Sequence, residues 1–191
     1  LYRKIVKNEE DIINNISLIA FCLFYAIRKK SHNAPININE IAETFQIYGH
    51  RVSPRLILRD GVRYKHYFTN KSKPKKSEDY IQRLLSDVIH HEDLEERLKF
   101  KRVPWAIEEY KRNLSKMCWE ILKKLSMWKR GGRSPFILAG AIIYLADRLI
   151  AEHFNQKAVL TQKMVSEATG IAEYSIRDHY VNLLKPLFLN Q

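Results

Sequence analysis

The chain has 191 residues, of which 33 are Lys or Arg and 21 are Asp or Glu, so its formal net charge is +12. A hydrophobic fraction of 46% excludes general disorder, and the positive charge favours a polyanionic partner such as nucleic acid. The two distant cysteines, Cys22 and Cys118, exclude a disulfide framework, the apolar runs are too short for a membrane span, and nothing at the start of the sequence resembles a signal peptide. We therefore expect an intracellular protein with no membrane segment.

The first half of the amino-terminal region predicts two helices. Residues 1–5 read as the end of a helix that began before Leu1, and residues 11–29 predict a long, mostly apolar helix. Apolar residues recur at helical spacing in that second helix, at Ile12, Ile16, Ile19, Leu23 and Ala26. We expect part of this stripe to remain exposed.

Two further helices follow, each with a clear start signal. Asn37 can cap a helix together with Glu40 three positions later, and Gly49 breaks that helix. Ser53 followed by proline predicts the next start, and this helix extends to about Phe68.

A basic segment separates this region from the rest of the chain. Residues 69–76 hold a proline and no apolar residue, which predicts an exposed linker. Residues 1–76 contain 15 Lys/Arg and 6 Asp/Glu, a net +9, whereas residues 77–191 contain 18 and 15, a net +3. Beyond the linker, helices are predicted at 77–91, 105–128 and 134–151, and no segment alternates as a strand would. The predicted fold class is therefore all-α.

Residues 160–184 predict a helix-turn-helix. Thr161 can cap the first helix, and Gly170 can take the left-handed conformation that ends it. In the second helix, which starts near Ala172, the predicted buried face consists of Ile176, Tyr180, Leu183 and Leu184. The opposite, outward face carries Tyr174, Arg177, Asp178 and Val181. An arginine on such a face suits the major groove of DNA, although two helices joined by a glycine are also ordinary in globular proteins.

An internal repeat is visible along the chain. Ala20, Cys22 and Tyr25 match Ala139, Ala141 and Tyr144, and the segment Leu58-Arg59-Asp60 matches Ile176-Arg177-Asp178. The order of a long apolar helix, a short capped helix and an Arg-Asp helix is the same in both halves, which favours a duplicated helical domain.

Four segments carry a resemblance to a known family: LYRKIV at 1–6, DYIQRLLSDV at 79–88, GGRSPFILAGAIIYLADRL at 131–149, and LTQKMVSEATGIAEYSIRDHYVNLL at 160–184. They resemble archaeal TFB and eukaryotic transcription factor IIB, strongly over 131–184 and weakly over 1–68. The resemblance implies tandem cyclin-like repeats, the first truncated at its amino terminus and the second ending in the helix-turn-helix. The implied domains are 1–70, a linker at 71–76, and 77–191.

This resemblance also implies a function and a set of contacts. The family's core domain binds the complex of TATA-binding protein with double-stranded promoter DNA and helps to place RNA polymerase, in the nucleus of a eukaryote or in the cytoplasm and nucleoid of an archaeon. The implied DNA contacts are Tyr174, Ser175, Arg177, Asp178, Val181, Leu58, Arg59, Arg133 and Lys163. Those implied for TATA-binding protein are Arg63, Lys65, Lys71, Lys73, Lys75 and Lys76. The chain departs from the family at Asp178 and His179, which weaken phosphate attraction, and at Tyr174, where the family has a small apolar residue.

Other readings remain open or are disfavoured by the residues. A cyclin-like module that regulates a kinase or another protein partner is the alternative function. His90 and His91 are adjacent on a helix and so point about 100° apart, which disfavours a metal site. No nucleophile and base stand at a recognisable motif spacing, so we expect neither an enzyme nor a small-molecule substrate, and we predict no cofactor or metal. Trp105, Trp119 and Trp128 are expected in the core or facing a partner.

Overall fold

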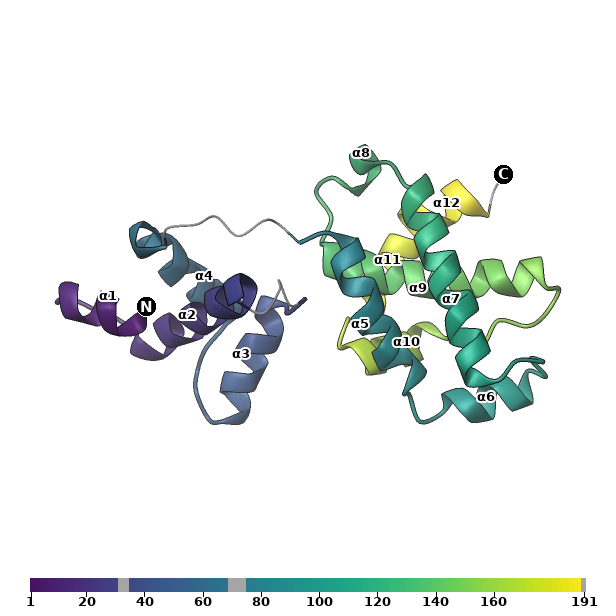
Figure 1. The fold of residues 1–191 in the computed structure, drawn as a ribbon, viewed down its shortest axis with the longest axis horizontal. Helices are drawn as coiled ribbons and strands as arrows, with labels where there is room; N and C mark the ends of the chain where they lie inside the picture. Colours follow the sequence, from purple (N-terminus) through teal and green to yellow (C-terminus); the bar gives the residue numbers. More distant parts are fainter. Residues whose placement is uncertain (31–34, 69–74, 190–191) are drawn as a thin grey trace. The chain divides into compact units, whose positions relative to one another are not determined.

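The computed structural model describes residues 1–30, 35–68 and 75–189, and every regular element in these ranges is helical (Figure 1). The predicted all-α fold class is therefore confirmed. The chain divides into two compact units, Leu1–Pro74 and Lys75–Gln191. No described helix combines the length and the apolar character needed to cross a membrane.

The amino-terminal unit contains four α-helices and one short 3₁₀ turn within its described residues. They are α1 (Tyr2–Asn8), α2 (Asn15–Lys30), α3 (Ile38–Ile47), α4 (Pro54–Arg63) and the 3₁₀ turn η1 (Lys65–Tyr67). α2 begins four residues later than predicted, because the side chain of Asn14 accepts hydrogen bonds from the amides of Ile16 and Ser17, both at 3.0 Å. α4 ends at Arg63 rather than near Phe68, and η1 replaces its predicted last turn.

The core of this unit is small and divided. One cluster of buried side chains is centred on Ala20, Phe24 and Ile57, and a second on Ile5 and Leu18. Of the stripe on α2 that we expected to be exposed, Ile19 and Leu23 are 39% and 43% exposed, and Ala26 is exposed too. Its other two members, Ile12 and Ile16, are partly buried against the two clusters, so the expectation holds for the last three positions.

The carboxy-terminal unit is larger. Its described elements are α5 (Ser77–Ile89), α6 (Leu94–Phe100), α7 (Ile107–Lys124), α8 (Met127–Arg130), α9 (Pro135–His153), α10 (Gln162–Thr169), α11 (Glu173–His179), the π-helical turn η2 (Tyr180–Leu184) and α12 (Lys185–Phe188). α6 and the π-helical turn were not predicted. The helix predicted at 105–128 is interrupted near its end, because Leu125 takes an extended conformation and separates α7 from α8.

α9 lies at the centre of this unit, packed against α5, α7 and α11 (Figure 1). It is buried along most of its length and contributes to one continuous hydrophobic core. The buried carboxylate of Asp147 connects α9 by hydrogen bonds to α7 and to the segment before α10. It accepts hydrogen bonds from the Tyr110 hydroxyl at 2.8 Å and from the amides of Val159 and Leu160 at 3.1 and 2.9 Å. The segment that leads into α10 is thereby attached to the centre of the unit.

Candidate nucleic-acid interface

The helix-turn-helix of the carboxy-terminal unit is built by local hydrogen bonds at the predicted positions. The Thr161 hydroxyl accepts from the amide of Met164 at 3.1 Å and caps α10. Gly170 ends α10 with φ of +68°, a conformation that only glycine adopts at little cost. The predicted cap and the predicted end of this helix are both confirmed.

The turn between α10 and α11 is fixed by two buried residues. The Thr169 hydroxyl donates to the carbonyl of Val165 at 2.5 Å and accepts from the amide of Ile171 at 3.3 Å. Ile171 packs so closely against α9 that a Cβ at Gly140 would lie 2.5 Å from its Cδ1. Ile176, with no exposed surface, holds the inner face of α11 against α9. These contacts set the position of α11 relative to the core.

The outer face of α11 presents the residues predicted for it. Tyr174 is 78% exposed and Val181 46%, and Arg177 is exposed between them. Asp178 is only partly exposed and accepts a hydrogen bond from the Asn182 amide at 2.7 Å. In the described part of the chain, the Arg177 guanidinium makes no ion pair with Asp178 or Glu173. Its five N–H groups are therefore available to a ligand.

Ser175 and Arg133, two other predicted DNA contacts, are partly exposed. The carbonyl of Ser175 is 2.9 Å from Nδ1 of the partly buried His179. Burial lowers the pKa of His179, and the nearby charge of Arg133 lowers it further, whereas the Ser175 carbonyl and Asp178 act in the opposite direction. Arg133, from the turn before α9, thus lies near α11, which brings together residues about 40 positions apart in the sequence.

Lys163, the last predicted DNA contact in this unit, lies on α10 and is exposed. Its amine is 3.6 Å from the carboxylate of Glu167, which in turn lies 3.5 Å from Nε2 of His91. Exposed pairs of this kind contribute less than about 1 kcal/mol, so Lys163 can exchange this partner for a phosphate.

The amino-terminal unit contains a second pair of helices of the same type. Asn37 and Glu40 form the predicted capping box of α3, and the Ser53 hydroxyl caps α4 by accepting from the Leu56 amide at 3.3 Å. Between the two helices, Gly49 takes a φ of +81°. The order of a long apolar helix, a capped helix, a left-handed glycine and a second helix is therefore the same in α2–α4 as in α9–α11.

The outer face of α4 is strongly basic. The predicted contacts Leu58 and Arg59 are both exposed, Leu58 by 50%, and Arg59 lies 3.6 Å from the buried carboxylate of Asp60. We did not predict three exposed neighbours that extend this face, Arg51, Arg55 and Val62, the last of which is 68% exposed. The recurrence of arginine at 51, 55, 59 and 63, every four residues, was the signal for them in the sequence.

The six residues predicted to contact TATA-binding protein differ in their exposure to solvent. Arg63, Lys65 and Lys76 are exposed, and the Arg63 guanidinium lies 3.5 Å from the carbonyl of Asp11. Lys75 is buried, with 7% exposure, so the expectation of an exposed linker cation is wrong at this position. Lys71 and Lys73 lie outside the described residues.

An aromatic–cation pair supports the internal repeat. In α9 the Arg148 guanidinium lies 4.7 Å from the ring centre of Tyr144, and in α2 the Lys29 amine lies 5.8 Å from that of Tyr25. Each cation stands four residues after its tyrosine. The two tyrosines are among the residues that the sequence comparison of the two halves matched.

Comparison with known proteins gives an informative similarity. The chain is 28% identical, over its whole length, to a protein from Thermoplasma volcanium described as transcription initiation factor IIB 1. It spans about half the length of that relative, since 51% of the relative is covered. No family model matches the chain. The similarity is a distant one, and it agrees with the all-helical fold.

Proposed function

We propose that the chain acts in transcription initiation as a core domain of the transcription factor IIB kind, which binds promoter DNA together with TATA-binding protein and helps to recruit RNA polymerase. The observation that carries this proposal is the outward face of α11, where Arg177 stands exposed between Tyr174 and Val181 on a helix held rigidly against its core. The similarity to an archaeal initiation factor, extending over the whole chain, supports it.

The two helix pairs have different parts in this proposal. Arg177 reads base edges in a major groove, because a guanidinium can pair with both acceptors of a guanine. Arg51, Arg55 and Arg59 bind phosphates at a second site, where exposed Leu58 and Val62 contact the sugars or the minor groove. The first contact supplies sequence preference, and the second supplies affinity for any sequence.

The contact with TATA-binding protein is proposed for Arg63, Lys65 and Lys76, which are exposed cations near the end of the first unit and the start of the second. Lys71 and Lys73 remain proposals from the sequence. Lys75 is left out of this surface because it is buried. An intracellular location, with access to the genome, goes with this function.

The decisive experiment compares two DNA flanks. A preferred flank is selected from randomised sequence upstream of a TATA box in the presence of TATA-binding protein, and binding to it is compared with binding to a scrambled flank. Arg177→Ala should weaken the complex on the preferred flank by about tenfold, since one base contact discriminates by roughly 1–3 kcal/mol, and should leave the scrambled flank almost unchanged. Arg112→Ala, which removes an exposed arginine of α7, is the matched control. Equal losses on both flanks for Arg177→Ala would show that Arg177 does not read bases.

A second function, that of a cyclin-like module for a protein partner, is favoured by the exposed apolar residues Ile19 and Leu23 on α2. It predicts that DNA binding is weak at every salt concentration and does not depend on Arg177. The experiment with two flanks therefore also separates the two functions.

A further inference from the structure

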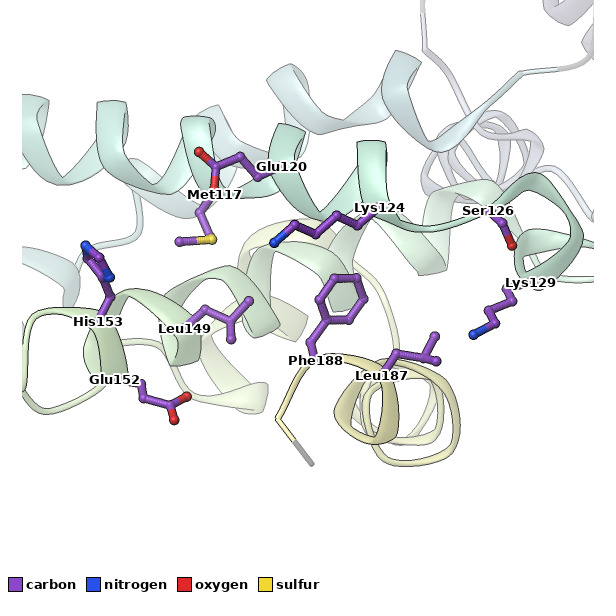
Figure 2. A pocket seen from close by; sticks show the side chains of 10 residues that line it. All are labelled: Met117, Glu120, Lys124, Ser126, Lys129, Leu149, Glu152, His153, Leu187 and Phe188. Carbon is purple, nitrogen blue, oxygen red and sulfur yellow. The ribbon is translucent and has the colours of Figure 1, made fainter. Parts of the chain in front are cut away.

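The carboxy-terminal unit has an open groove of about 710 Å³ between α7, α8, the end of α9 and α12 (Figure 2). This volume is in the range typical of ligand and peptide sites. No residue of the groove belongs to the surfaces assigned above to DNA or to TATA-binding protein.

The floor of the groove is apolar. Figure 2 shows Met117 extending from α7 toward Leu149 on α9, while the ring of Phe188 points from α12 toward α7. With Leu187, these side chains are only partly buried at the edge of the main hydrophobic core. Apolar surface at the edge of a core gains free energy when another apolar group covers it.

The charges of the groove are separated along its length. Figure 2 shows Glu152 and His153 at one end and Ser126 and Lys129 at the other. Lys124 extends from the end of α7 over the floor, and Glu120 lies one turn earlier on the same helix. In the part of the chain that the structure describes, neither Lys124 nor Lys129 has an ion-pair partner.

From these features we infer that the groove binds a short amphipathic segment of another protein, with apolar side chains on the floor and a carboxylate beside Lys124 and Lys129. Charge complementarity selects this occupant. A nucleic acid strand would bring phosphates close to Glu120 and Glu152, and a second copy of a chain with a net charge of +12 would be repelled. A protein segment can instead match the lysines with an acidic residue and the glutamates with a basic one.

An exposed aromatic residue extends the surface at its basic end. α8, which carries Lys129, also presents Trp128 with 92% exposure and Met127 with 64%. Tryptophan is enriched among the residues that dominate protein interfaces. A partner that covers Trp128 would remove its large apolar surface from water. A bound segment longer than the groove would contact Trp128.

The test uses a library of random 16-residue peptides displayed on phage and selected against the whole chain. The selected peptides should combine large apolar residues with Asp or Glu, and their affinity is measured by fluorescence anisotropy of the labelled peptide. Lys124→Glu should weaken binding by about tenfold, as expected for a close charge pair across an interface. Lys123→Glu is the matched control, because it makes the same exposed charge change one residue away and outside the groove.

Further measurements separate a loss of binding from a loss of folding. Trp128→Ala alters a side chain that contributes almost nothing to the core, so a loss of affinity there reports on the interface. A peptide whose acidic residue is replaced by lysine should bind Lys124→Glu better than it binds the unchanged protein. Arg177→Ala should leave peptide affinity unchanged, so this inference and the proposed function can fail separately.

Several outcomes would overturn the inference. These are the absence of any selected peptide, equal binding to the Lys124→Glu and Lys123→Glu variants, and competition of the peptides by DNA alone. A self-associating chain that loses its dimer on Phe188→Ala would overturn it too, because the occupant would then be a second copy.

Discussion

The two helix pairs, α3–α4 and α10–α11, share a design and differ in what they present and in what supports them. The outer face of α4 has arginines at 55, 59 and 63, with Arg51 just before the helix, whereas that of α11 has one arginine, with Asp178 beside it. Beneath α11 lies one continuous core, and beneath α4 lie two small clusters. The arginines are therefore concentrated on α4, the helix with the smaller supporting core. The single arginine of α11 lies on the helix with the larger, continuous core. The proposed function predicts this division, because a phosphate contact tolerates small displacements and a base contact does not.

The largest effect that would test this contrast is expected at Asp147, the buried anchor of the carboxy-terminal unit. Asp147→Ala leaves the Tyr110 hydroxyl and the amides of Val159 and Leu160 without their acceptor. At roughly 1–3 kcal/mol for each of these three buried unsatisfied donors, the free energy of unfolding of this unit should fall by at least about 3 kcal/mol.

Hydrogen exchange followed residue by residue measures the effect of Asp147→Ala in each unit. Amides of α9 and α10 should lose protection, while those of α2 and α4 should keep theirs. Asp178→Ala, a carboxylate on the surface of α11, is the control and should change little. Equal loss of protection in both units would mean that the two supports are not separate.

The next effect concerns close helix contacts, which both units have. A Cβ at Gly61 would lie 2.2 to 2.7 Å from three ring atoms of Phe21, whereas one at Gly140 would meet the end of the Ile171 side chain. A ring moves less easily than a terminal methyl group, so Gly61→Ala should lower the free energy of unfolding by about 1–3 kcal/mol. Gly140→Ala should cost less, because the flexible end of the Ile171 side chain can move aside for the added methyl group.

Urea denaturation of each alanine variant gives these values. Adding Phe21→Leu to Gly61→Ala should recover part of the lost stability by making room for the methyl group. If Gly140→Ala proved the more harmful change, the turn at Ile171 would be the tighter of the two contacts.

A smaller effect, of the order of 1 kcal/mol, is expected on DNA affinity when the α4 face loses charge. The double variant Arg51→Ala/Arg55→Ala removes two exposed guanidinium groups without breaking a described ion pair. Each phosphate contact contributes about 0.9 to the slope of log affinity against log salt, so this slope should fall by about two, and by the same amount on every sequence. Anisotropy titrations between low and moderate salt measure it. The control variant Lys116→Ala/Lys123→Ala removes two exposed charges from α7 and should leave this slope unchanged.

The smallest effect is a pH dependence at His179, beneath the outer face of α11. Burial lowers the pKa of this imidazole in the folded chain, so below the usual histidine value near 6.5 the unfolded chain binds a proton more readily. Its contribution to stability is thus present above that value and is lost as the pH falls through the lowered pKa. His179→Gln should reduce the loss of stability seen on acidification, as measured by denaturation at several pH values, and His90→Gln at an exposed position should not.

Sequence was sufficient where a structural feature depends on near neighbours in the chain. Asn37, Ser53 and Thr161 cap their helices as predicted, and Gly170 is left-handed, because each forms bonds within a few residues of itself. The outward positions of Tyr174 and Arg177 also follow from helical periodicity alone, once the buried face is recognised.

Tertiary structure decided the features that depend on which distant surfaces cover a residue. The apolar residues of α2 surround most of the helix, so their spacing alone does not show that Leu18 and Phe24 would be buried while Leu23 stays exposed. The same holds for the burial of Lys75, for the anchoring role of Asp147, and for the groove that brings Met117 and Phe188 together. Burial is a property of packed pairs of elements, and it is set by their shared surface and not by local propensity.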